Sequence, residues 1–310
     1  MLSRCHLTTQ RIIFRMDYHL WLPFQNEWLT FLVILASILI FVMTSELVLR
    51  YEILSPESNR RLVHICVGSL ITLSPIFFNN YELPAALALI FIILNYFAYH
   101  NKKFKGIHSQ DRITYGTIYF PIGYLIISIG FWQYTELVII SLSLLTISDP
   151  IASYIGENTS KNTEFVIWED KKTVKGTIAF FISSILIIFL ITKFLFDLSI
   201  TYLLFFTLFT AIGATIAEIT SSRGSDNLSI PIISILFMLG FLEGIPSISL
   251  NIMDILLSEK LLMIYLLTFL FFVAYRLRTL SLDGLFGAGI MGTLIILFGS
   301  KYHLLSMATF

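Results

Sequence analysis

The chain has 310 residues, of which 56% are hydrophobic and only 13% are charged, with equal numbers of basic and acidic residues. Soluble domains carry about 25% charged residues, so the composition excludes an ordinary soluble protein. Zero net charge argues against nucleic-acid binding. Cys5 and Cys66 lie far apart and form neither a disulfide framework nor a metal-binding pattern.

The N-terminal segment, residues 1–27, precedes the first long apolar run. It carries Arg4, Arg11 and Arg15 and no acid over its first fifteen residues. Two interpretations stay open: a short transit-like leader, or sequence before a true start at Met16. We favour the second.

Nine or ten apolar runs near twenty residues long follow, and as helices we expect each to cross roughly 30 Å of hydrocarbon. They cover about 28–49, 62–78, 83–99, 113–131, 135–155, 176–196, 200–220, 228–250, 260–277 and 284–299. The sequence therefore predicts an all-α, polytopic integral membrane protein. We divide it into a main membrane domain, 28–250, and extra transmembrane helices in 251–310.

Lys and Arg residues gather in alternate connections, which predicts the topology. The basic connections are 50–61, 101–112, 157–175, 221–227 and 276–283. The positive-inside rule places these in the cytoplasm. We expect a bacterial plasma membrane, or a plastid or endoplasmic-reticulum membrane in a eukaryote. The polar clusters described next all lie at this cytoplasmic face.

The first cluster begins the second apolar helix with Glu57, Arg60, Arg61 and His64. Spacings of three and four place these side chains at neighbouring positions of a helix. Arg60 and Arg61 can hold phosphate oxygens, and His64 can carry a proton. The alternative is a basic anchor at the membrane surface beside one satisfied histidine.

The second cluster is Asp149-Pro150 with Ala152 and Gly156. A carboxylate at the end of an apolar helix is costly and calls for a function, such as a Mg²⁺ or phosphate site. Alternatively, Asp149 is an N-cap and Pro150 the first residue of a restarted helix. Ala152 and Gly156, four residues apart, allow close approach of a backbone or a ligand.

The third cluster is the loop Lys171-Lys172-Thr173-Val174-Lys175-Gly176. Lys172 and Thr173, just before a helix start, can bind phosphates. The alternative is that these lysines only set the topology.

The fourth cluster combines Glu218 with Gly224-Ser225-Asp226-Asn227. Ala211, Ala214 and Glu218 share one helix face, so we expect the acid to point into a packed interface and not into lipid. The Gly-Ser-Asp-Asn run is either part of a site or only a turn. A further match, Gly287-x-Gly289-x-x-Gly292, follows no strand, so we attribute it to helix packing and not to dinucleotide binding.

Together the clusters supply acids for Mg²⁺, bases for phosphates and groups that orient a hydroxyl, the parts that phosphoryl transfer requires. No Walker A sequence, kinase glycine loop, Ser-His-Asp order or zinc spacing is present.

At these residues the chain resembles the CTP-dependent polyprenol kinase family, which includes phytol, farnesol and dolichol kinases. The resemblance covers about 40–240 and is greatest to the phytol kinase branch. It rests on Arg60-Arg61-Leu-Val-His64, Tyr115-Gly116-Thr117 with Phe120-Pro121, Asp149-Pro150-x-Ala152-x-x-x-Gly156, Lys172-Thr173-x-x-Gly176, and Ala214-Thr215-x-x-Glu218 with Asp226-Asn227-Leu-x-x-Pro231.

This resemblance implies phosphoryl transfer from CTP to a long isoprenoid alcohol taken from the bilayer, with Mg²⁺. Under that interpretation, Asp149 and Asp226 are candidates to bind Mg²⁺ or to act as the general base, and His64 is a candidate for proton transfer. Glu218 and Asn227 would orient the metal or the hydroxyl. The nucleotide or its phosphates would be contacted by Arg60, Arg61, Lys172, Thr173, Gly156 and Gly176.

Two residues depart from the family pattern, which usually has an acid where this chain has Lys175 and an Arg where it has Glu157. Residues 276–299 resemble the start of the family that includes phytyl-phosphate kinase, which acts next in phytol salvage. That match indicates a truncated or vestigial second domain. The alternative functions are a dolichol or diacylglycerol kinase and, in another class, a secondary transporter for an anionic solute.

Overall fold

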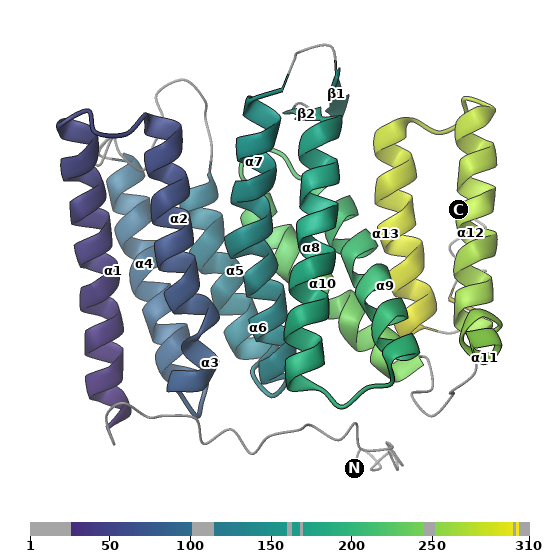
Figure 1. The fold of residues 1–310 in the computed structure, drawn as a ribbon, viewed down its shortest axis with the longest axis horizontal. Helices are drawn as coiled ribbons and strands as arrows, with labels where there is room; N and C mark the ends of the chain where they lie inside the picture. Colours follow the sequence, from purple (N-terminus) through teal and green to yellow (C-terminus); the bar gives the residue numbers. More distant parts are fainter. Residues whose placement is uncertain are drawn as a thin grey trace.

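The computed structural model describes residues 26–100, 115–159, 163–167, 170–244, 252–299 and 302–303. Most of these residues are helical, and the long helices run roughly antiparallel in one bundle (Figure 1). The elements are α1 Glu27–Arg50, α2 Pro56–Thr72, α3 Ser74–Phe77, α4 Glu82–His100, α5 Gly116–Phe131, α6 Thr135–Ser143, the π-turn η1 Leu144–Ser148, α7 Asp149–Glu157, β1 Glu164–Ile167, β2 Asp170–Thr173, α8 Val174–Leu195, α9 Ile200–Ile219, α10 Asp226–Gly244, α11 Ile252–Leu256, α12 Glu259–Arg276 and α13 Leu282–Phe298.

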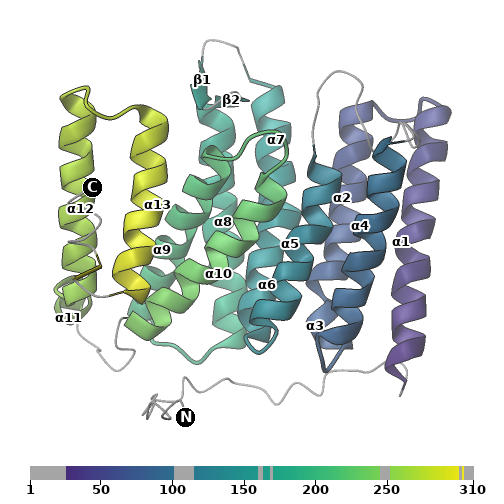
Figure 2. The ribbon, with the colours of Figure 1, turned by 180° about the vertical axis from the view of Figure 1, so that it is seen from behind.

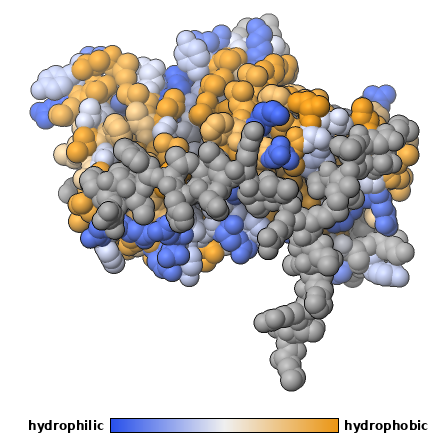
Figure 3. Space-filling view, turned by 60° about the horizontal axis from the view of Figure 1, so that its bottom comes forward, coloured by the Kyte–Doolittle hydropathy of each residue, from blue (hydrophilic) through white to orange (hydrophobic). Residues whose placement is uncertain are grey.

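Among the described residues, six helical segments are long and apolar enough to cross a membrane, which confirms the all-α polytopic prediction. They are Glu27–Arg50, Pro56–Phe77, Thr135–Glu157, Val174–Leu195, Ile200–Ile219 and Asp226–Gly244. Broad areas of hydrophobic side chains cover the flanks of the helices (Figure 3). The protein is therefore an integral, multi-pass membrane protein.

The helix starts follow ordinary capping chemistry. Asn26 caps α1 by accepting a hydrogen bond from the amide of Trp28. Ser55 caps α2 through the amide of Ser58, with Pro56 in the first turn. Within the described residues, each predicted apolar run coincides with one helix or with consecutive helical elements. Apart from Asn26 and Glu27, the N-terminal segment lies outside the described residues.

The basic connections that the structure describes lie at one end of the bundle, whereas 101–112 lies outside the described residues. The ends of α1 and α2, of α9 and α10, and of α12 and α13 meet at the end that is uppermost in Figure 1. The β1–β2 hairpin between α7 and α8 lies there too, and Figure 2 shows the same grouping from behind. Which side of the membrane this end faces stays a prediction.

The centre of the bundle is packed around α9. Ala211, Ala214 and Ala217 of this helix are fully buried, which lets α8 and α10 approach closely. Gly213 faces the ring of Phe237 on α10, so no larger residue fits there. Glu218 lies on the same helix and is only 6% exposed, as its predicted position in a packed interface requires.

Two local structures differ from the sequence predictions. Strands β1 and β2 pair antiparallel, with Phe165 opposite Lys172, whereas a plain loop was expected. Asp149 does not cap a restarted helix. Its backbone is helical, and α6, η1 and α7 form one continuous span through the π-turn. The N-cap interpretation of Asp149 is therefore wrong.

The C-terminal helices α12 and α13 pack against each other, and α13 also contacts α9 and α10. Gly292 of α13 faces Leu267 of α12, as close packing predicts. Gly287 and Gly289 face open space, so helix packing does not explain these two glycines. The proposed origin of residues 251–310 as part of a second domain stays a prediction.

Candidate functional site

A cavity of about 390 Å³ lies at the end of the bundle that carries the basic connections. Its walls come from α1, α2, α4, α5, α7, β2, α8, the end of α9 and the start of α10. All the site candidates predicted from the sequence line it, although they span more than half of the chain: Arg60, Arg61, His64, Asp149, Gly156, Lys172, Thr173, Gly176, Glu218, Asp226 and Asn227.

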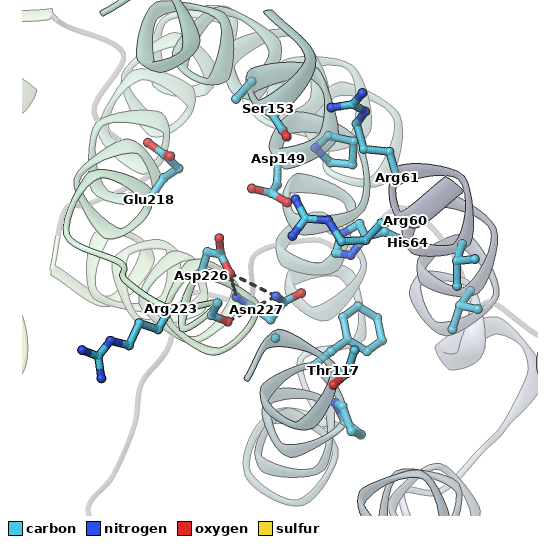
Figure 4. A pocket seen from close by; sticks show the side chains of 18 of the residues that line it. Arg60, Arg61, His64, Thr117, Asp149, Ser153, Glu218, Arg223, Asp226 and Asn227 are labelled. Carbon is cyan, nitrogen blue, oxygen red and sulfur yellow. Dashed lines mark hydrogen bonds between the residues drawn. The ribbon is translucent and has the colours of Figure 1, made fainter. Parts of the chain in front are cut away.

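Three of the five carboxylates that line the cavity act on one another electrostatically. Asp149, Asp226 and Glu218 come from three different helices and surround the same space (Figure 4). Asp149 is under the electrostatic influence of Asp226, Lys172, Glu218 and Arg60. Within the described residues, no hydrogen-bond donor contacts its carboxylate. Such a group of acids repels itself unless a cation or a proton lies among them.

Lys172 is one of the cations that the fold places near these acids. Strand β2 carries it to the cavity, where its Nζ donates to Oε1 of Glu218 at 2.5 Å. Burial alone would lower the pKa of the Lys172 ammonium, but the charges of Glu218, Asp226 and Asp149 outweigh burial and leave the pKa above its ordinary value. Lys172 therefore stays protonated at neutral pH.

The π-turn explains the position of His64. The amide of Asp149 bonds to the carbonyl of Leu144, five residues earlier, and Pro150 has no amide hydrogen. Neither residue therefore satisfies the carbonyl of Leu145, which lies 2.9 Å from Nε2 of His64. His64 is thus a satisfied histidine that joins α2 to η1. The contact supports the structural alternative for this residue. π-turns are frequent at functional sites.

The two arginines of α2 have different surroundings. Arg61 forms an ion pair with Glu157 of α7, and its guanidinium also lies 5.5 Å from the centre of the Tyr154 ring. The guanidinium of Arg60 points towards Asp149 instead (Figure 4). Glu157 is one of the residues that depart from the family pattern. In this chain its carboxylate pairs with Arg61, which was predicted to contact phosphate.

Gly156, Thr173 and Gly176 bring α7 and α8 together. A Cβ at Gly176 would lie 3.1 Å from the carbonyl oxygen of Ala152 and 3.4 Å from Cα of Gly156. The Thr173 hydroxyl accepts from the amide of Gly176 at 3.1 Å and so caps α8. These residues line the cavity, and their contacts assign them to helix packing and capping.

The start of α10 is held closely against α5. Oδ1 of Asp226 accepts from the amide of Asn227 at 2.8 Å and from its Nδ2 at 3.0 Å. A Cβ at Gly123 would lie 2.7 Å from the carbonyl oxygen of Asn227, so glycine is required for this approach. Backbone bonds of Arg223 to Tyr115 and to the Asp170 carboxylate brace the same end of the bundle.

Four side-chain atoms among the cavity-lining residues are buried without a hydrogen-bond partner: Oε2 of Glu218, Oδ1 of Asn227, Oγ1 of Thr117 and Oγ1 of Thr177. Buried polar atoms are rarely left unpaired, so their concentration here indicates a place for a polar ligand. Thr177 was not predicted as a site residue, and Thr117 was named only in the family pattern. Both are polar residues at the ends of apolar helices, a signal that could have identified them.

A metal site made only of protein groups is absent from the described part of the chain, where no three His, Cys, Asp or Glu side chains are close enough to bind one ion. Mg²⁺ usually binds through one or two carboxylates together with substrate phosphates and water. Asp149 and Asp226 fit that requirement because their carboxylates share one cavity.

The chain is similar to a phytol kinase from Synechocystis sp., with 22% identity over 194 residues. The match covers 62% of this chain and 82% of that protein. No protein-family model matches the chain, and no solved structure matches it. The distant similarity, together with the apolar helices, supports a membrane enzyme of the polyprenol kinase type.

Proposed function

We propose that this protein transfers the γ-phosphoryl group of CTP to the hydroxyl of a long-chain isoprenoid alcohol, such as phytol, to give the isoprenyl monophosphate. The main support is a single cavity that has a charged end and an apolar end. A charged phosphate donor and a hydrocarbon acceptor require such a combination. The similarity to phytol kinase supports the same reaction.

The charged end supplies groups for the triphosphate. Lys172 stays protonated and lies among acids, and Arg60 points into the same space (Figure 4). Both would contact phosphate oxygens. Asp149 and Asp226 would hold Mg²⁺, which when bound neutralises phosphate charge. The unpaired hydroxyls of Thr117 and Thr177 would form hydrogen bonds with the nucleotide or the alcohol, and the unpaired Oδ1 of Asn227 would accept one.

The reaction breaks one bond and forms another. The alcohol oxygen attacks the γ-phosphorus, and the bond from this phosphorus to the oxygen that bridges to the β-phosphate breaks, which releases CDP. The hydroxyl proton passes to a carboxylate of the group formed by Asp149, Asp226 and Glu218. No covalent enzyme intermediate is required, because positioning and charge stabilisation account for most of phosphoryl-transfer catalysis.

Membranes that contain the protein, incubated with γ-labelled CTP and phytol, test the proposal. We expect a labelled lipid whose formation requires Mg²⁺ and stops when Mg²⁺ is chelated. ATP, GTP and UTP in parallel establish the donor. If dolichol or diacylglycerol is labelled and phytol is not, that alcohol is the acceptor and the proposal of phytol is wrong. No labelled lipid with any alcohol would overturn the kinase proposal and favour a transporter.

A further inference from the structure

The cavity continues from its charged end into an apolar arm between α2, α4 and α5, backed by α1. The arm is lined by apolar side chains that include Val67 and Ile71 of α2, Leu87 and Ala88 of α4, and Phe120 and Tyr124 of α5. The acids and the phosphate-binding groups lie at the other end of the same cavity.

Each of the three helices changes from polar to apolar along its cavity-facing side. The change runs from Arg60 to Ile71 on α2, from Thr117 to Tyr124 on α5, and in the reverse chain direction from Asn95 to Leu87 on α4. The helical rise of about 1.5 Å per residue gives the α2 side a length of roughly 16 Å.

The inner end of the arm is closed. Leu87 and Ala88 are 0% and 2% exposed, so they are packed on all sides and form the wall at which the arm ends. The Tyr124 hydroxyl donates to Oγ of Ser74 at 2.7 Å, and that hydroxyl donates to the carbonyl of Ile71 at 2.6 Å. This buried chain of hydrogen bonds fixes the Tyr124 ring and gives the arm a defined depth.

We propose that this arm holds the hydrocarbon tail of the alcohol and that Leu87, Ala88 and Tyr124 set the longest tail accepted. The inference rests on the proposed function, because the hydroxyl of a bound alcohol would lie among the acids. Lipid is as apolar as the arm, so leaving the bilayer gives the tail little affinity. The arm therefore selects tail length and positions the hydroxyl. A protein interior resists extra volume, so a tail that is too long displaces the hydroxyl.

Purified protein in lipid nanodiscs, assayed with alcohols of two, three and four isoprene units, tests this inference. Ala88→Phe fills the arm, and we expect it to lower kcat/KM for the longest alcohol on the order of tenfold or more relative to the shortest. Leu87→Ala lengthens the arm and should shift preference towards longer alcohols. The matched control is Leu89→Phe, because Leu89 is 49% exposed on the outer side of the same helix and should leave the preference unchanged.

A second measurement does not depend on turnover. Each alcohol should raise the melting temperature of the wild type, and Ala88→Phe should remove this effect first for the longest alcohol. Suppose that the wild type phosphorylates alcohols and that Ala88→Phe and Leu87→Ala keep its length preference. This result would overturn the tail inference and leave the kinase proposal standing. A wild type that is stabilised by the alcohols in this length-dependent way but transfers no phosphate keeps the tail inference and overturns the kinase proposal.

Discussion

Nζ of Lys172 lies 2.5 Å from Oε1 of Glu218, and this ion pair joins the β1–β2 hairpin to the last turn of α9. The side chains are 17% and 8% exposed, and Oε2 of Glu218 has no partner. Removing one member of a buried pair leaves an uncompensated charge. The pair therefore contributes both to stability and to the charge of the site.

Lys172→Met should lower the free energy of unfolding by about 3 kcal/mol and abolish phosphoryl transfer, because Glu218 is left buried and charged. The double variant Lys172→Met/Glu218→Gln should recover much of the stability but no activity. Thermal unfolding in nanodiscs and the transfer assay measure both effects. Equal melting of Lys172→Met and wild type would contradict the prediction.

The stabilisation from Lys172 should not change between pH 7 and pH 9. Its folded pKa is raised, so the contribution is fully present below the unfolded pKa of about 10.4 and is lost only as pH rises through the folded value. The difference in melting temperature between wild type and Lys172→Met, followed over this range, checks the sign. A difference that shrinks as pH rises towards 9 would mean a lowered pKa.

Arg60→Ala should raise KM for the nucleotide on the order of tenfold, which corresponds to the loss of one charge-assisted hydrogen bond. Arg61→Ala should have a smaller effect, since Glu157 already holds that guanidinium. Steady-state kinetics with varied CTP distinguish the two variants. The opposite order would show that Glu157 releases Arg61 when the nucleotide binds.

Pro150→Ala should lower kcat on the order of tenfold to a hundredfold, because a shift of about 1 Å in a reacting group has effects of this size. The substitution gives the Leu145 carbonyl a possible helical donor and so competes with His64 for it. Pro75→Ala, in α3 at the far end of the bundle, serves as the matched control. Unchanged kcat in Pro150→Ala would mean that the π-turn does not position Asp149.

The apolar runs and the gathering of polar residues could be predicted from the sequence because both depend on local composition and spacing. The burial of Glu218 followed from Ala211 and Ala214 on the same helix face. The hairpin was missed because each strand has four residues and β2, Asp170–Thr173, is entirely polar. The Arg61–Glu157 pair joins residues 96 positions apart, and neither local pattern contains the partner. The contact of His64 with the Leu145 carbonyl at the π-turn joins residues 81 positions apart, so no local pattern predicts it.

The most direct test of the proposed reaction is the transfer of label from γ-labelled CTP to phytol by purified wild type, Asp149→Asn and Asp197→Asn in nanodiscs. Asp197 is an exposed acid in the α8–α9 connection at the opposite end of the bundle, so its variant controls for loss of a charge alone. We predict that wild type and Asp197→Asn form phytyl monophosphate and CDP in equal amounts, and that Asp149→Asn is folded and loses at least about a hundredfold in rate. Wild-type activity in Asp149→Asn, or no product from wild type, would contradict the account.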